Sequence, residues 1–145
     1  MKVFGRGFAG FEEELREKVK KIKNVQFVGE VGDEEKLTLM KGARAYIFAS
    51  YDEDFGITPV EAMGQGTPVV AFKSGGVKET VVDPSASSGQ AGATGVFYNK
   101  NTPDALNQAI EKFEKAKISK DECVRQAKKF EKKTFIQLVQ KTVAG

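Results

Sequence analysis

Histidine is absent from the 145 residues. The chain therefore lacks the commonest general base and any Ser-His or Cys-His dyad. Its single cysteine, Cys123, has no second cysteine for an intramolecular disulfide and no histidine for a Cys/His metal site. We interpret Cys123 as a small buried residue. Chemistry in this chain must depend on carboxylates, backbone groups or the substrate.

Long hydrophobic runs are also absent. No segment approaches the roughly 18 apolar residues of a membrane span, and the N-terminus lacks the basic-then-apolar pattern of a secretion signal. Hydrophobic residues make up 40% of the chain and charged residues 30%, a balance typical of globular proteins. We expect one compact domain over residues 1–145. A cytoplasmic location is favoured, and the protein could there lie at the inner face of the membrane.

Charge is unevenly distributed along the chain. Residues 1–110 hold 13 basic and 15 acidic side chains, whereas residues 111–145 hold 10 basic and 5 acidic. A basic helical tail can bind nucleic acid or an anionic membrane surface. The tail lacks aromatic residues interleaved for base stacking, so nucleic acid is not expected as a partner. A solvated helix face is the simpler interpretation, and peripheral membrane contact stays open.

Short apolar strands alternate with helical patterns. The predicted strands are residues 1–4, 25–28, 43–50, 68–72 and 95–98. The predicted helices are residues 11–23, 33–41 and 58–65, a short helical turn over 77–82, a helix that starts at 103 and continues beyond 113, and a last helical region over about 120–142. Parallel strands need helix-length crossovers, so this order predicts an α/β fold with a doubly wound, Rossmann-like parallel sheet. Residues 84–94 lack periodicity and large apolar side chains, which predicts a mobile surface loop.

Two glutamates separated by seven residues follow the longest apolar strand. Glu53 comes just after it, at the end of the strand where ligands bind in doubly wound sheets. Gly56 lets the backbone approach a ligand, and the free amides of the helix that follows attract phosphate. Glu61, about two turns along, could accept hydrogen bonds from vicinal hydroxyls. By spacing alone, a loop carboxylate and a surface charge explain the pair more simply.

The residues around this pair resemble a known family. Glu-Asp-Phe-Gly-Ile-Thr-Pro-Val-Glu-Ala-Met, residues 53–63, looks like the Glu-x7-Glu motif of the GT4 family of GT-B glycosyltransferases. Residues 25–31, 66–71 and 75–81 resemble the C-terminal domain of that family in order and spacing. The resemblance covers most of the chain. It implies the C-terminal, donor-binding half of a retaining GT-B glycosyltransferase.

The resemblance also implies roles for residues near the motif. Glu53 would bind hydroxyls of the donor sugar and is the implied catalytic residue. The backbone of Phe55, Gly56 and Ile57 would meet the sugar or the diphosphate, and Glu61 would bind the ribose. The implied ligand is a nucleoside diphosphate sugar, with no further cofactor. A metal ion is not needed when cations and a helix N-terminus stabilise the departing diphosphate.

Candidates earlier in the chain are implied in the same way. Gly5 and Gly7 belong to a glycine-rich turn that would lie near the donor phosphates. Val31 and Asp33 fall where the family often contacts the base, and Lys36 where a side chain can pack against it. For each of the last three, an ordinary helix start is an alternative explanation.

Family members also have an N-terminal acceptor domain, and the resemblance places the start of this chain after the unit that supplies an Arg and a Lys to the diphosphate. That missing domain is an expected partner, so we expect weak donor binding and little transfer by the chain alone. The motif resembles mannosyltransferase-type members, which implies a hexose such as mannose transferred from GDP-mannose with retention. The last helix packs towards the other domain in relatives, so Phe130, Phe135 and Leu138 are expected to be partly exposed and to drive self-association.

Two other functions stay open. Gly5, Gly7 and Gly10 match G-x-G-x-x-G, and Glu30 follows at the spacing of a ribose-binding acid, as in NAD-binding Rossmann domains. That hypothesis leaves residues 53–71 unexplained. The second open function is that of an interaction module, which would use its basic C-terminal helices to bind a partner or a membrane surface.

Overall fold

The computed structural model describes residues 1–6, 10–84 and 92–143. Contacts divide the chain into two compact units, residues 1–38 and 39–145, and we describe each by itself. Among the described residues, no helix has both the length and the apolar character needed to cross a bilayer. The single domain expected from the length stays a prediction.

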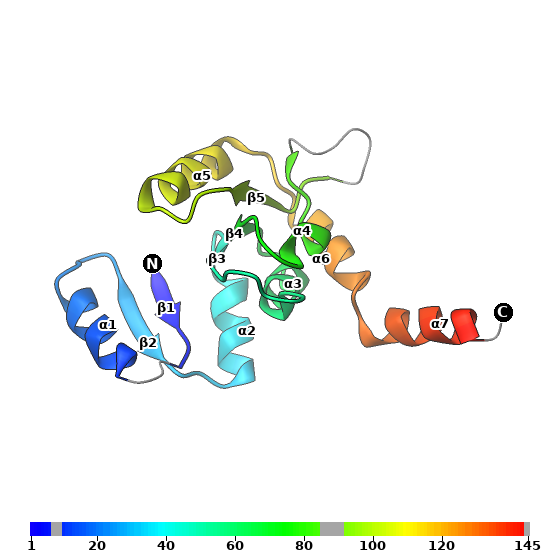
Figure 1. Cartoon of the computed structure of the whole chain (residues 1–145), viewed down its shortest axis with the longest axis horizontal. Coiled ribbons are helices and arrows are strands. Elements are labelled where there is room, and N and C mark those ends of the chain that lie inside the picture. Colours follow the sequence, from blue (N-terminus) through cyan, green and yellow to red (C-terminus); the bar gives the residue numbers. More distant parts are fainter. Residues whose placement is uncertain (7–9, 85–91, 144–145) are drawn as a thin grey trace. The chain divides into compact units, whose positions relative to one another are not determined.

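The first unit is a βαβ element (Figure 1). β1 (Lys2–Phe4) pairs in parallel with β2 (Gln26–Gly29), and α1 (Phe11–Lys20) connects the two strands. The guanidinium of Arg16 lies 4.7 Å from the centre of the Phe27 ring, a cation–π contact between α1 and β2. The helix ends at Lys20, before the predicted end at residue 23. Next in the chain is α2 (Asp33–Lys41), which begins in the first unit and ends in the second.

The second unit contains a parallel three-stranded sheet in the order β3-β4-β5. Its strands are β3 (Tyr46–Phe48), β4 (Val69–Phe72) and β5 (Gly95–Tyr98). Every residue of β4 is buried, as expected for a parallel strand covered on both faces. The helices are α3 (Ile57–Gly64), α4 (Val77–Thr80), α5 (Pro103–Lys115), α6 (Lys120–Lys128) and α7 (Lys132–Val143), as labelled in Figure 1.

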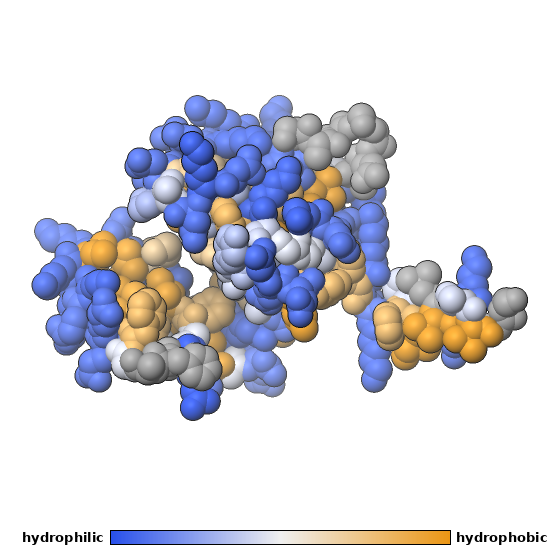
Figure 2. Space-filling model, in the orientation of Figure 1, coloured by the Kyte–Doolittle hydropathy of each residue, from blue (hydrophilic) through white to orange (hydrophobic). Residues whose placement is uncertain are grey.

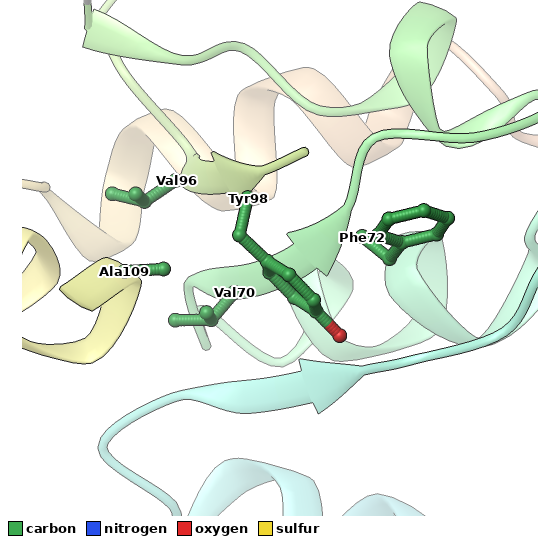
Figure 3. Packing of buried hydrophobic residues seen from close by; sticks show 5 residues of the cluster. All are labelled: Val70, Phe72, Val96, Tyr98 and Ala109. Atoms are coloured by element: carbon green, nitrogen blue, oxygen red, sulfur yellow. The ribbon is translucent and has the colours of Figure 1, made fainter. Parts of the chain in front are cut away.

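Helices cover both faces of this sheet. Because side chains alternate along a strand, Val70 and Phe72 point to one face of the sheet. There they pack with Val96 and Tyr98 of β5 and with Ala109 of α5 (Figure 3). Full burial of a side chain such as valine or phenylalanine contributes about 1.5–3 kcal/mol. Val69 and Ala71 are buried on the opposite face, where α3 contacts β4 and α3 packs against α6. The predicted parallel α/β fold is confirmed.

The structure adds detail to two segments of the sequence-based expectation. The helical region expected over residues 120–142 consists of two helices, α6 and α7, and between them the amides of Lys129 and Phe130 donate to the Gln126 and Ala127 carbonyls at 3.1 and 2.9 Å. Thr94, expected in a surface loop, is buried, and its hydroxyl accepts from the Val82 amide at 2.9 Å. Residues 85–91 of that loop lie outside the described residues.

The absence of a side chain at Gly95 allows the first residue of β5 to pack closely against Val69 and Val81. A Cβ at this position would overlap the Val69 carbonyl oxygen and lie 2.7 Å from Cγ1 of Val81. We expect Gly95→Ala to lower the free energy of unfolding by about 1–3 kcal/mol through overpacking. Gly64→Ala is the control, because its Cβ would make only an ordinary 3.9 Å contact with Ala127 in a helix that favours alanine. Urea unfolding compares the two, and equal stability would contradict the prediction.

Cys123 is fully buried, as the sequence suggested, and burial raises the pKa of its thiol from 9.0 to about 11. A group whose pKa is raised by folding contributes stability below its unfolded pKa, and this stability is lost as pH rises through the folded pKa. Between pH 9 and 11, we expect the free energy of unfolding to fall more steeply for the unchanged chain than for Cys123→Ala. Urea unfolding across this range measures both slopes. Parallel slopes would show that the thiol contributes nothing.

Candidate functional site

The loop after β3 is tied to the loop after β4. The Asp52 amide donates to Oγ of Ser74 at 3.1 Å, and that hydroxyl donates to Oδ1 of Asp52 at 2.5 Å. Asp52 has a φ of 49°, a conformation that aspartate adopts more readily than most residues. The Tyr51 ring stacks on Phe72 at the end of β4, with 5.7 Å between ring centres. The two loops therefore support each other at the carboxyl edge of the sheet.

Two glycines bring the backbones of these loops into contact. The Gly76 amide donates to the Glu53 carbonyl at 3.0 Å. A Cβ on Gly75 would overlap that carbonyl oxygen, and a Cβ on Gly76 would lie 2.7 Å from Cα of Phe55. Gly75 also has a φ of 62°, which favours glycine. The position of the Glu53–Phe55 backbone therefore depends on the absence of side chains at residues 75 and 76.

The next helix starts directly after this loop. Gly56 is buried and is the N-cap of α3, with a φ of 73° that favours glycine. No side chain caps the N-terminus of α3, and its first turn holds no acidic residue. The first amides of a helix lack intrahelical acceptors and carry the positive end of the helix dipole. The N-terminus of α3 is therefore suited to an anionic group.

Glu61 shares a cavity with two other predicted site residues. This cavity, about 710 Å³ in volume, is lined by Phe55, Ile57 and Glu61 together with residues of α6, α7 and the segment between them. Phe130 from that segment packs edge-on against Phe55, with 5.7 Å between ring centres. The structure thus brings Phe55, Ile57 and Glu61 together around one space. Glu53 and Gly56 belong to the adjoining loop backbone and do not line the cavity.

The side chain of Glu53 is not committed to an internal ion pair. It is partly exposed, and within the described residues its carboxylate forms neither a hydrogen bond nor a salt bridge. Its backbone is held by Gly76, as described above. A carboxylate on a held backbone, with its oxygens uncommitted, can accept hydrogen bonds from hydroxyl groups of a ligand.

The remaining candidates belong to the N-terminal part of the chain. The Gly5 amide donates to the Gly29 carbonyl at 2.9 Å, and Gly7 lies outside the described residues. Val31 is partly buried just before α2. Asp33 and Lys36 form a 3.1 Å salt bridge in the first turn of α2. Their roles at a ligand stay predictions.

The dinucleotide alternative meets an electrostatic obstacle. Gly10 has a φ of 79° and is the N-cap of α1, where a pyrophosphate would have to bind. The first turn of α1 holds Glu12, Glu13 and Glu14, which would repel that anion. Glu30 is exposed after β2. The two helix starts therefore differ, because only that of α3 is free of acidic residues.

Sequence reasoning missed Ser74 and linked Phe130 only to self-association. A serine after a strand is common in turns, so nothing in the sequence connected Ser74 to Asp52. Phe130 contacts Phe55 from the segment between α6 and α7, and no proline or glycine marks that segment in the sequence. For Leu138 the side chain lies outside the described part of the structure, whereas Phe135 is 65% exposed. Figure 2 shows apolar side chains gathered along α7.

The comparison with protein families decides the classification. The family described as "Glycosyl transferases group 1" matches residues 4–130. The chain belongs to the group 1 glycosyltransferases. This match covers both the Glu53–Glu61 segment and the paired glycines, so the features of the site lie within the region shared with the family.

Several curated glycosyltransferases are similar to this chain in sequence. It is 36% identical over 98 residues to the alpha-1,3/1,6-mannosyltransferase ALG2 of Dictyostelium discoideum, which covers 66% of this chain and 21% of the relative. It is 35% identical over 91 residues to the D-inositol 3-phosphate glycosyltransferase of Corynebacterium diphtheriae, covering 60% and 19%. The chain therefore spans about a fifth of the length of these relatives.

Solved structures of GT-B glycosyltransferases share the fold. Anabaena HepE in complex with UDP matches with a TM-score of 0.70 and 26% identity, over 99% of this chain and 40% of that one. Sucrose-phosphate synthase from Thermosynechococcus elongatus matches with a TM-score of 0.76 and 24% identity, over 99% and 38%. The expected GT-B relationship of this group 1 glycosyltransferase is confirmed at the level of the fold.

The paired glycines of this group 1 chain can be tested directly. Gly76 has an ordinary helical φ of −69°, so alanine there changes only the steric contact with residues 54 and 55. We expect Gly76→Ala to displace the Glu53–Phe55 backbone and to cost about 1–3 kcal/mol of stability. Amide chemical shifts of residues 52–56 and urea unfolding report the two effects. Gly32→Ala, whose Cβ would meet nothing within 4 Å, is the control, and similar shifts in both variants would refute the contact.

Proposed function

We propose that this chain is the donor-binding domain of a GT4 glycosyltransferase that transfers a hexose, with retention, from a nucleoside diphosphate sugar. The observation that carries the proposal is the arrangement around the start of α3. An uncapped helix N-terminus without acids follows a loop whose backbone is held by Gly75 and Gly76. Glu61 lies on the same helix and faces the adjoining cavity.

The chemistry follows from this arrangement. Amides at the start of α3 would stabilise the charge that develops on the leaving diphosphate, since a positioned dipole needs no reorganisation during the reaction. Glu53 would bind hydroxyls of the sugar beside the diphosphate, and Glu61 those of the ribose. The backbone of Phe55 to Ile57 would pass closest to the phosphates, with Gly56 allowing the approach.

Mannose is the proposed sugar. The support is the match to relatives named as alpha-1,3/1,6-mannosyltransferases in several organisms. Glucose is the second candidate, because HepE, which resembles this chain in structure at 26% identity, was solved with UDP-glucose. Transfer by the complete protein would also need an acceptor-binding domain, which is the proposed partner of this chain. A location in the cytoplasm stays a prediction.

A binding titration tests the donor site. We expect one of UDP, GDP or ADP, and its sugar conjugate, to bind the chain more tightly than the other two. Glu61→Gln should weaken that nucleotide about tenfold, the loss expected for hydrogen bonds to a charged acceptor. Glu53→Gln should weaken the sugar conjugate while leaving the nucleoside diphosphate alone nearly unchanged, because Glu53 is assigned to the sugar.

Glu111→Gln on the exposed face of α5 is the matched control, since it removes the same charge away from the site. Isothermal titration measures all four proteins. Binding that is unchanged in Glu61→Gln, or that is equally reduced by Glu111→Gln, would refute the assignment. Tight binding of NAD(H) with no response to nucleoside diphosphates would favour the dinucleotide hypothesis instead.

A further inference from the structure

A second pocket in the larger unit has a different character. Its volume is about 360 Å³, and it lies among the ends of β4 and β5, α4, α5 and α6. Four lysines line it, from four different segments: Lys73, Lys78, Lys112 and Lys129. None of the residues that line the cavity beside α3 also lines this pocket. It is therefore a separate feature of the unit.

Two of the lysines are held by buried polar side chains. Asp83 is 4% exposed, and its carboxylate accepts from the Phe97 amide at 2.8 Å and from Nζ of Lys112 at 3.1 Å. Gln126 is 5% exposed; it donates to the Thr80 carbonyl at 2.9 Å and accepts from Nζ of Lys129 at 2.7 Å. Each buried group has a backbone partner on one side and an ammonium group on the other. Both ammonium groups are thereby positioned at the pocket.

The other two lysines are less committed. Nζ of Lys73 lies 5.8 Å from the centre of the Phe97 ring, a weak cation–π contact at most. The ammonium group of Lys78 on α4 forms no ion pair or hydrogen bond within the described residues. Two acids, Glu79 and Asp83, also line the pocket. Because four lysines outnumber them, the lining has an excess of positive charge. Asn99 adds a carboxamide that can donate hydrogen bonds.

We propose that this pocket binds a phosphate monoester, the dianionic group of a phosphorylated small molecule or of a lipid headgroup. Four ammonium groups from separate segments surround a space of the size that small ligands occupy. Lysine binds phosphate as a point charge with three donors. Pre-positioned ammonium groups lose less side-chain entropy on binding than free surface lysines do. The proposal does not depend on the donor site beside α3.

The test is a titration of the whole 145-residue chain with inorganic phosphate at constant ionic strength, followed by amide chemical shifts. Saturable shifts are expected at residues 81–83 and 99, with residues 53–57 unaffected. Glycerol 3-phosphate should produce the same pattern with equal or higher affinity. Prior saturation with the preferred nucleoside diphosphate should leave these shifts in place. Shifts confined to residues 53–57, or the absence of saturable shifts, would overturn the proposal.

Charge-matched double variants separate a built pocket from general attraction. Lys78→Gln/Lys129→Gln removes two ammonium groups from the pocket and leaves Asp83 paired with Lys112. We expect it to weaken phosphate at least about tenfold. Lys115→Gln/Lys117→Gln removes the same charge at exposed positions outside the pocket and should leave the affinity unchanged. Equal weakening in both variants would mean non-specific electrostatic attraction and would overturn the proposal.

Vesicles identify the source of the phosphate group. Phosphatidylcholine vesicles with and without phosphatidic acid are compared in a flotation assay. Binding that requires phosphatidic acid and is displaced by glycerol 3-phosphate supports a lipid headgroup. Binding of the soluble ester without binding to vesicles supports a soluble phosphorylated ligand. Vesicle binding that persists in Lys78→Gln/Lys129→Gln would contradict the use of this pocket.

Discussion

The close approach of two backbones at the carboxyl edge of the sheet organises the larger unit. Gly75 and Gly76 lie so near to residues 53–55 that any side chain there would overlap main-chain atoms. The loop that carries Glu53 is therefore positioned by steric exclusion and by one amide–carbonyl hydrogen bond. The Asp52–Ser74 pair and the Tyr51–Phe72 stack act on the same two loops. Together these contacts hold the backbone of Glu53 next to the start of α3.

The helix that starts at this edge of the sheet differs in charge from other helix starts of the chain. α1, α2 and α6 begin with acidic residues, which stabilise a helix by opposing its dipole. α3 begins with none, and it also lacks a capping side chain. Such a helix gives up local stability, and burial of Pro59, Ala62 and Met63 against the rest of the unit offsets the loss. A start of this kind favours an external anion.

Most of the fold could be predicted from the sequence, because apolar runs and helical periodicity depend on local residues. Residues 68–72 and 95–98 were predicted as strands almost as the structure has them, and α5 starts at Pro103 as expected. Tertiary contacts were beyond such reasoning. Phe130 contacts Phe55 from the segment between α6 and α7, and helical periodicity does not locate the ends of these two helices. Spacing and resemblance proposed Glu53 and Glu61, but the pairing of Asp83 and Gln126 with lysines required coordinates.

Asp83 also affects how the sheet meets its surroundings. β5 is the last strand of the three-stranded order, and the outer edge of such a strand presents backbone groups to which another extended chain can add. Asp83 already occupies the Phe97 amide, and Lys112 places a charge at the same point. A foreign strand would have to displace a buried carboxylate before it could pair. The same salt bridge that lines the lysine pocket would thus hinder the addition of a strand at this edge of β5.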